Sequence, residues 1–213
     1  MSLFLGPIHI WMFNKILILE SRAFALAEAL EKSGNGGVGA VVEEYGQRLE
    51  GRNLADILGD NSIHQFLYGL IGRAQIMEAR LMELAGDGGA QLVKVAEEHG
   101  RQTARGAVAK AGSNPQTLED IYRQVNDHHM EGMPCDPGAE TTQESKTVMG
   151  YCHSSCNHIQ NWSYTGADVK AMCGLTNAWL AGFVSELNPA AVYEVKETLA
   201  EGAGSCRATI TLG

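Results

Sequence analysis

Basic residues are scarce in this sequence. Sixteen Lys and Arg residues stand against twenty-five Asp and Glu residues, which gives a formal net charge of -9. Proteins that bind nucleic acid normally gather a basic face against the phosphate backbone, and no run of Lys or Arg occurs here. The composition therefore argues against nucleic acid as a partner. It also leaves few cations for a carboxylate-bearing substrate, and Arg207, beside Cys206, is the candidate that remains.

The sequence also lacks a long uninterrupted apolar run. The most apolar segment, FLGPIHIWMFNKILIL (4–19), contains Asn14 and Lys15, so it falls short of the roughly 20 apolar residues that a membrane-spanning helix needs. No basic segment precedes it, as a secretory signal would require. We therefore expect no membrane partner and a cytoplasmic location. The apolar residues before Asn14 point to a buried or intersubunit surface, which leaves a homo-oligomer open.

Cysteine pairs at the spacing of a zinc knuckle are missing. Five cysteines are present, and this odd number favours reduced thiols over a disulfide framework. Three residues separate Cys152 from Cys156, while Cys173 and Cys206 stand alone. A free cysteine on a helix face is usually a small buried apolar side chain. We therefore expect no cofactor, with zinc held by these four cysteines as the less favoured alternative.

Helical periodicity dominates residues 14 to about 130. Residues 62–85 carry apolar side chains at intervals of three and four, with Ser62 as a candidate N-cap, and residues 90–110 resume the pattern after a glycine-rich turn. The segment SNPQTLEDIYRQV (113–125) predicts another helix, capped by Asn114 and with Pro115 in its first turn. This part of the sequence predicts four or five packed helices.

The pattern changes at EGMPCDPGAETTQES (131–145), whose prolines and glycines indicate a connection. Beyond it, SKTVMGYCH (145–153) predicts a strand and residues 166–189 a helix, while residues 191–200 and 205–212 predict a hairpin around a glycine-rich turn. The fold class is therefore α+β: a helical N-terminal half (1–132), then a small antiparallel sheet with a helix packed across it (133–213), forming one compact unit.

Several motifs of the second half occur in a recognisable order. These are Cys152 at a strand end, GADVKAMC (166–173), AWLAGF (178–183), the Asn188–Pro189 pair and TLAEGAGSCRATI (198–210). In this order the sequence resembles the L-2-amino-thiazoline-4-carboxylic acid hydrolase family. The layout is also similar to the 4-vinyl-reductase type of small-molecule-binding domain. The resemblance covers about the last 60 to 75 residues, and the helical half only in kind.

Two positions depart from these patterns. Thr176 stands where the hydrolase pattern has an acidic residue, three positions after Cys173. Glu197 matches a zinc-binding glutamate of the binding-domain relatives, but no cysteine follows it closely. The resemblance therefore implies the fold more firmly than the reaction, because sites are grafted onto folds.

The hydrolase resemblance implies a reaction in which water, or a protein nucleophile first, attacks the amidine carbon between nitrogen and sulfur. Such chemistry needs a thiolate or activated water, a base and N–H donors. The candidate catalytic residues are Cys152, His153, Cys156 and Cys206. The candidate ligand-binding residues are Cys173, Asn177, Trp179 and Arg207.

Strand alternation limits how many of these residues reach one pocket. Cys152 and His153 are adjacent on a predicted strand, so at most one of them faces inward, and the same holds for Cys206 and Arg207. The alternative is that these side chains only fill the space between sheet and helix. We identify MGYCHSSCNHIQNW (149–162) as a strand turning into a helix at the mouth of a pocket.

The sequence thus leads to a hydrolase-like protein that opens a carbon–nitrogen bond of a small cyclic amidine, such as a 2-aminothiazoline carboxylate. A non-catalytic domain that binds or senses a small apolar or aromatic ligand, with structural zinc as an option, is the alternative. Either protein would have a small molecule as its partner.

Overall fold

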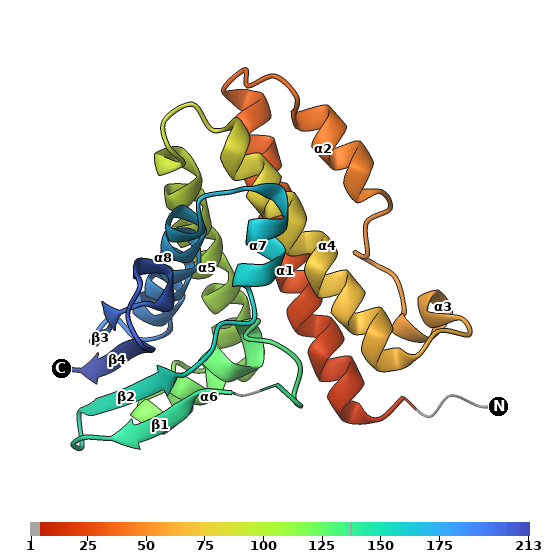
Figure 1. The fold of residues 1–213 in the computed structure, drawn as a ribbon. Helices are drawn as coiled ribbons and strands as arrows, with labels where there is room; N and C mark the ends of the chain where they lie inside the picture. Colours follow the sequence, from red (N-terminus) through yellow and green to blue (C-terminus); the bar gives the residue numbers. More distant parts are fainter. Residues whose placement is uncertain (1–4, 137) are drawn as a thin grey trace.

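The computed structural model describes residues 5–136 and 138–213 (Figure 1). The helices are α1 (Pro7–Lys32), α2 (Val38–Tyr45), α3 (Leu54–Leu58), α4 (Ile63–Leu84), α5 (Ala90–Ala111), α6 (Leu118–His128), α7 (Ile159–Thr165), α8 (Val169–Leu187) and the short 3₁₀ helix η1 (Leu199–Glu201). The strands are β1 (Glu140–Gln143), β2 (Val148–His153), β3 (Ala191–Glu197) and β4 (Cys206–Leu212). The α+β prediction is confirmed, with helices in the first half and an antiparallel sheet in the second.

Helix α1 packs against α4 and α5 at the centre of the helical half. It carries a buried charge into that core, because Arg22 donates to both carboxylate oxygens of Glu78 on α4, at 2.6 and 2.9 Å. A buried charge is tolerated when it is paired and hydrogen-bonded in this way. Lys15, two turns earlier on α1, is also buried but lies within ion-pair distance of no carboxylate in the described residues.

Helices α5 and α8 join the two halves through close backbone contact. A Cβ atom on Gly100 would overlap the carbonyl oxygen of Trp179, and a Cβ atom on Gly182 would overlap that of Glu97. The two glycines therefore let the helix backbones approach closely. One continuous cluster of buried apolar side chains contains residues from both halves of the sequence.

The sheet has the strand order β1-β2-β4-β3, and every neighbouring pair is antiparallel. His153 lies opposite Cys206, and Tyr151 opposite Ala208, so these side chains share one face. Helices α6 and α8 pack against the sheet (Figure 1). Buried residues such as Ala208 and Ile210 mark the packed face.

Two local predictions need correction. Helix α6 begins at Leu118, because Thr117 caps it by accepting a hydrogen bond from the Asp120 amide, 3.1 Å away; Asn114 instead donates to the Leu187 carbonyl. Strand β1 lies inside the segment predicted as a connection. The prediction that residues 149–162 are a strand turning into a helix agrees with β2 and α7. Pro137, which the sequence places in the connection, lies outside the described residues.

Within residues 5–136 and 138–213, no helix combines the length and apolarity needed to span a bilayer.

Candidate functional site

A cavity of about 90 Å³ lies between the packed face of the sheet and α8. Side chains from β2, β3, β4 and α8 form its walls, and the segments that follow α6 and β2 contribute the rest. Six of the eight residues predicted for the site line this cavity: His153, Cys156, Cys173, Asn177, Cys206 and Arg207. The sheet and α8 thus bring together residues up to fifty-four positions apart in the sequence, from His153 to Arg207.

Cys152 does not line the cavity. It lies between Tyr151 and His153 on β2, both of which do, so alternation directs its side chain to the opposite face of the sheet. The prediction that at most one of the Cys152–His153 pair faces inward holds, and that residue is His153. Cys152 is therefore the candidate catalytic residue that the structure places outside the cavity.

Trp179 lies deeper than predicted. Its indole Nε1 donates to Nδ1 of His99, 2.9 Å away, and its ring stacks on Phe183 at a centroid distance of 4.9 Å. Trp179 lines a separate small recess beneath the cavity and not the cavity itself. Through these contacts Trp179 holds the face of α8 that packs against the helical core.

Cys206 and Arg207 both contribute to the cavity, although alternation predicts that only one would. Cys206 faces the cavity opposite His153. The long side chain of Arg207, which starts from the other face of β4, reaches only the rim near the bulge at Lys196 on β3. The Arg207 side chain stays largely exposed at the rim, with Nε 3.1 Å from Glu197 Oε1. The length of the Arg207 side chain explains the incorrect prediction.

Glu131 and His153 form the main ionisable pair on the cavity wall. Nε2 of His153 lies 3.6 Å from Oε2 of Glu131. Burial opposes ionisation of Glu131, but the interaction with His153, together with Lys15 and His158, outweighs it and lowers the pKa of this carboxyl group. An ionised carboxylate beside an imidazole orients the ring and stabilises its protonated form, which is the arrangement of a general base.

The cavity thiols are poorly activated. Burial, followed by the proximity of Cys206 and Cys156, raises the pKa of Cys173 to about 11, although Asn177 Nδ2 donates to its sulfur at 3.4 Å. Burial also raises the pKa of Cys206, whose sulfur accepts a hydrogen bond from the Leu199 amide at 3.3 Å. Both thiols are therefore protonated near neutral pH and are weak nucleophiles.

Two buried donors face the cavity without partners. Neither the Tyr151 hydroxyl nor the Trp162 indole N–H makes a hydrogen bond within the described residues, and both side chains line the cavity. Buried polar groups normally find a partner, so each such donor calls for water or a ligand atom. Tyr193, beside Tyr151, does have one, since its hydroxyl donates to Asn177 Oδ1 at 2.8 Å. The free donors suit a ligand that carries hydrogen-bond acceptors.

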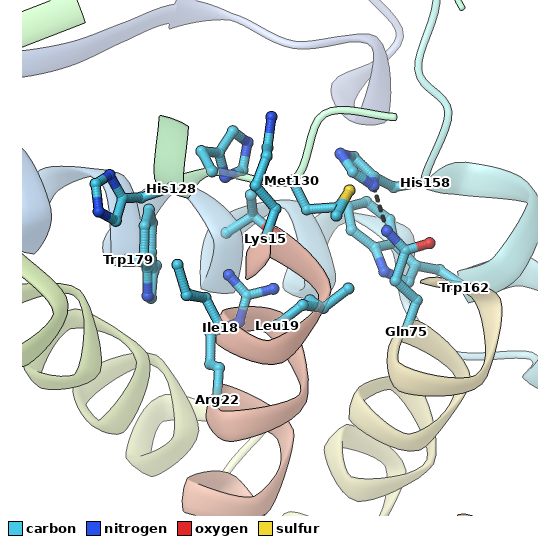
Figure 2. A pocket seen from close by; sticks show the side chains of 12 residues that line it. Lys15, Ile18, Leu19, Arg22, Gln75, His128, Met130, His158, Trp162 and Trp179 are labelled. Atoms are coloured by element: carbon cyan, nitrogen blue, oxygen red, sulfur yellow. Dashed lines mark hydrogen bonds between the residues drawn. The ribbon is translucent and has the colours of Figure 1, made fainter. Parts of the chain in front are cut away.

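A recess of about 10 Å³ continues beneath the cavity, with His129, His158, Trp162 and Thr176 lining both spaces. Figure 2 shows Lys15 and Arg22 reaching it from α1. This volume holds roughly one water molecule. Burial lowers the pKa of Lys15 to about 8, against the opposing effects of Glu131 and Asp127. Of these two cations, Lys15 is the one that lacks a carboxylate partner within the described residues, since Arg22 is paired with Glu78.

The imidazole of His158 is held neutral in this recess. Burial, with a contribution from Arg22, lowers its pKa to about 4. Asn161 Nδ2 donates to Gln75 Oε1, and Gln75 Nε2 lies 2.6 Å from His158 Nδ1, as the dashed line in Figure 2 marks. The Gln75 amide thus donates to Nδ1, so the ring proton resides on Nε2. His158 is a hydrogen-bond donor at neutral pH.

No group of three or more His, Cys, Asp or Glu side chains in the part of the chain that the structure describes is arranged to hold a metal ion. Cys152 faces away from the other cavity cysteines, which separates the four proposed zinc ligands. The four cysteines therefore do not form a zinc site in this arrangement.

Sequence reasoning missed several residues of the cavity wall: His129, Glu131, Tyr151 and Tyr193. Alternation from His153 back along β2 could have indicated Tyr151, because both residues occupy one face of the strand. His129 and Glu131 follow the end of α6, and only the tertiary fold brings that segment to β2. His128, the neighbour of His129, interacts with the end of α6 instead, through the Gln124 carbonyl at 2.8 Å.

Comparisons with protein-family models, with curated proteins and with solved structures gave no match for this chain, so the family resemblance remains a prediction from the sequence.

Proposed function

We propose that this protein is a hydrolase that opens a carbon–nitrogen bond of a small cyclic amidine, with a 2-aminothiazoline carboxylate as the representative substrate. The observation that carries the proposal is the Glu131–His153 pair on the wall of a small, aromatic-rich cavity. The cavity of about 90 Å³ has room for roughly six to nine water-sized groups at ~10–15 Å³ each. A five-membered ring with two small substituents has this size.

The proposed reaction begins with a water molecule between His153 and the amidine carbon. His153 removes a proton from the water as the oxygen bonds to the carbon, and Glu131 stabilises the resulting imidazolium. As this bond forms, the π electron pair of the amidine C=N bond moves to the ring nitrogen, which takes the first proton from the imidazolium. His153 then removes the proton of the new hydroxyl group, the carbonyl forms as the ring carbon–nitrogen bond breaks with its electron pair on nitrogen, and the imidazolium gives this second proton to that nitrogen. The product has gained one water molecule, and His153 is restored.

The protonation state of the cavity thiols favours water, and not a cysteine, as the nucleophile. The raised pKa values of Cys173 and Cys206 keep both protonated at neutral pH. Cys156 lines the cavity as well and is the thiol left to test for a covalent route.

Two other features support this substrate class. Tyr151 and Trp162 offer unpartnered donors for charge that develops on the substrate heteroatoms. Arg207 at the rim can approach a substrate carboxylate, in competition with its ion pair to Glu197.

The test is incubation of the purified chain with L-2-aminothiazoline-4-carboxylate, followed by mass spectrometry and NMR of the small molecule. We expect a ring-opened product that is heavier by one water. Replacing His153→Asn removes the base and should lower kcat by at least ~100-fold. Cys152→Ser is the matched control on the outer face of β2 and should leave kcat unchanged. Loss of activity in Cys156→Ser would replace the water route with a covalent one.

A second candidate is a non-catalytic binding or sensor domain for a small aromatic ligand. The specific observation in its favour is that thiols with raised pKa values and neutral histidines line the site, and these are inert at neutral pH. It predicts saturable binding of the same compound without product. If the compound neither binds nor is converted to product, both candidates are contradicted.

The proposal also includes a cytoplasmic location, which the five free cysteines support. A homo-oligomer stays a prediction that nothing in the structure tests.

A further inference from the structure

A second concave region lies on the opposite side of the helical half from the sheet. Helices α2 and α7 both pack on α4 (Figure 1), and the three helices line an open groove of about 480 Å³. The groove shares no lining residue with the cavity described above. The two sites are therefore separate spaces, although Asn161 of the groove donates to Gln75, which contacts His158 of the cavity.

Two arginines on α4 give the groove its charge. The Nε atoms of Arg73 and Arg80 are buried and lack hydrogen-bond partners within the described residues. Arg80 Nε lies 3.2 Å from Glu44 Oε2, an ion-pair distance without hydrogen-bond geometry. Glu44 offsets one of the two positive charges, so the groove keeps a net positive charge in a chain whose formal net charge is -9.

Arg73 is held in place by neutral groups. Its guanidinium lies 4.3 Å from the centre of the Tyr45 ring, and Nη2 lies 3.3 Å from the Tyr45 hydroxyl and 3.4 Å from the Gln47 carbonyl. Burial, followed by the hydrogen bond to Glu20, raises the pKa of Tyr45 well above its usual range, so this tyrosine stays uncharged. The positive charge of Arg73 therefore has no carboxylate partner among the described residues, and its orientation is fixed for a ligand.

Aromatic rings flank these arginines. Tyr68 is 46% exposed and Tyr164 is 76% exposed, although apolar and aromatic side chains of this size are mostly buried elsewhere in the chain. Both rings line the groove. Exposed aromatic rings beside a cation are typical of sites that bind a planar anionic ligand.

Gly69 leaves space in the groove, although neither packing nor backbone conformation requires a glycine at this position. A Cβ atom at this position would meet no atom within 4 Å. Glycine within a helix is unfavourable relative to alanine, and neither close packing nor a positive φ requires it here. A larger side chain at Gly69 would occupy the space between Tyr68 and Arg73 without disturbing the core.

We propose that this groove binds a small aromatic anion, such as an aromatic carboxylate or sulfonate. The ring packs against Tyr68 and Tyr164, and the anionic group binds the guanidinium of Arg73. The groove is a ligand site in addition to the cavity and does not depend on the hydrolase proposal.

The probe is naphthalene-1-sulfonate, with neutral naphthalene-1-methanol as the matched compound. Both are titrated into the full chain by calorimetry and by amide NMR. The sulfonate should bind at one site and shift the signals of residues around Tyr68, Arg73 and Tyr164. Arg73→Met should weaken binding of the sulfonate by ~10-fold, since it removes one charged hydrogen-bond donor group. The affinity for the alcohol should stay unchanged.

Gly69→Leu should abolish binding of both compounds while keeping or raising thermal stability. Gly106→Leu on α5 is the matched control, because Gly106 is also helical, exposed and free of neighbours around its Cβ position. The proposal is overturned if the sulfonate and the alcohol bind equally, if Gly69→Leu retains binding, or if the shifts map to the cavity around Cys173 and Ala208.

Discussion

At the scale of single residues, the site is defined by which titratable groups stay neutral. His99, His129 and His158 all have pKa values lowered by burial, with nearby cations adding to the effect. His99 accepts from Trp179 and contacts Ser21 Oγ at 3.1 Å, as expected for a satisfied core histidine. Against this background, His153 is set apart by its carboxylate partner, Glu131.

Cys173 provides a prediction at this scale. Its pKa of about 11, two units above the ordinary value of 9.0, leaves ~100-fold less thiolate at neutral pH than a free thiol has. Alkylation by iodoacetamide at pH 7.5 should therefore be at least ~100-fold slower at Cys173 than for N-acetylcysteine. Peptide mapping by mass spectrometry gives the rate at each cysteine.

The exposed Cys135 serves as the internal reference in that experiment. Modification of Cys173 at the rate of Cys135 would show that the thiol is activated, and would return a cysteine nucleophile to the mechanism.

At the scale of secondary-structure elements, the contact between α5 and α8 fixes the wall of the cavity, because α8 carries Cys173 and Asn177. Gly182→Ala would push a methyl group into the Glu97 carbonyl on α5. We expect it to lower the free energy of unfolding by about 1–3 kcal/mol, as overpacking does. Urea unfolding followed by circular dichroism measures this change.

Gly174→Ala is the control on the same helix, since a Cβ atom there meets nothing within 4 Å. It should raise the free energy of unfolding by about 0.5–1 kcal/mol through helix propensity. Equal effects of the two substitutions would mean that α5 and α8 do not approach as closely as described.

Elements with a clear apolar pattern could be predicted from the sequence, whether long or short. The apolar stripe of residues 62–85 reproduces α4 closely, because many positions agree on one period. Strand β1 could not be predicted, because its four residues, ETTQ, carry no apolar alternation and it forms by pairing with β2. The start of α6 was misplaced because Asn114 and Thr117 are both good caps, and the contact of Asn114 with α8 decides between them.

The same limit applies to the site. Residue type indicated His153 and Cys156, and the family resemblance indicated Cys206. Alternation required only that at most one of Cys152 and His153 face inward. Glu131 could not be predicted, because its partner His153 is twenty-two positions away and only the fold joins them. Cys152 was favoured by the family resemblance, and the alternation of β2 excludes it from the cavity.

At the scale of the whole molecule, the buried histidines set the acid stability. The folded-state pKa values of His99 and His158 are about 4, below the ordinary 6.5, so the unfolded chain binds more protons between these values. The contribution of these neutral histidines to the free energy of unfolding is therefore fully present above pH 6.5 and is lost as the pH falls towards 4. For His99 the loss at pH 5 is about 2 kcal/mol.

Urea unfolding at pH 7.5, 6 and 5 checks this window. The variant His99→Gln removes one of the titrating groups and should show a shallower decline, whatever its stability at pH 7.5. A free energy of unfolding that is constant between pH 7.5 and 5 would contradict the account of neutral buried histidines.

The most direct test of the central claim, that the cavity between the sheet and α8 is the substrate site, is an amide NMR titration with L-2-aminothiazoline-4-carboxylate. The wild-type chain and His153→Asn are both used, so that turnover in the former does not obscure binding. The account predicts saturable shifts for the segments 153–157, 173–177 and 206–208, each of which contributes side chains to the cavity wall. Shifts confined to other regions, or none at all in either chain, would contradict it.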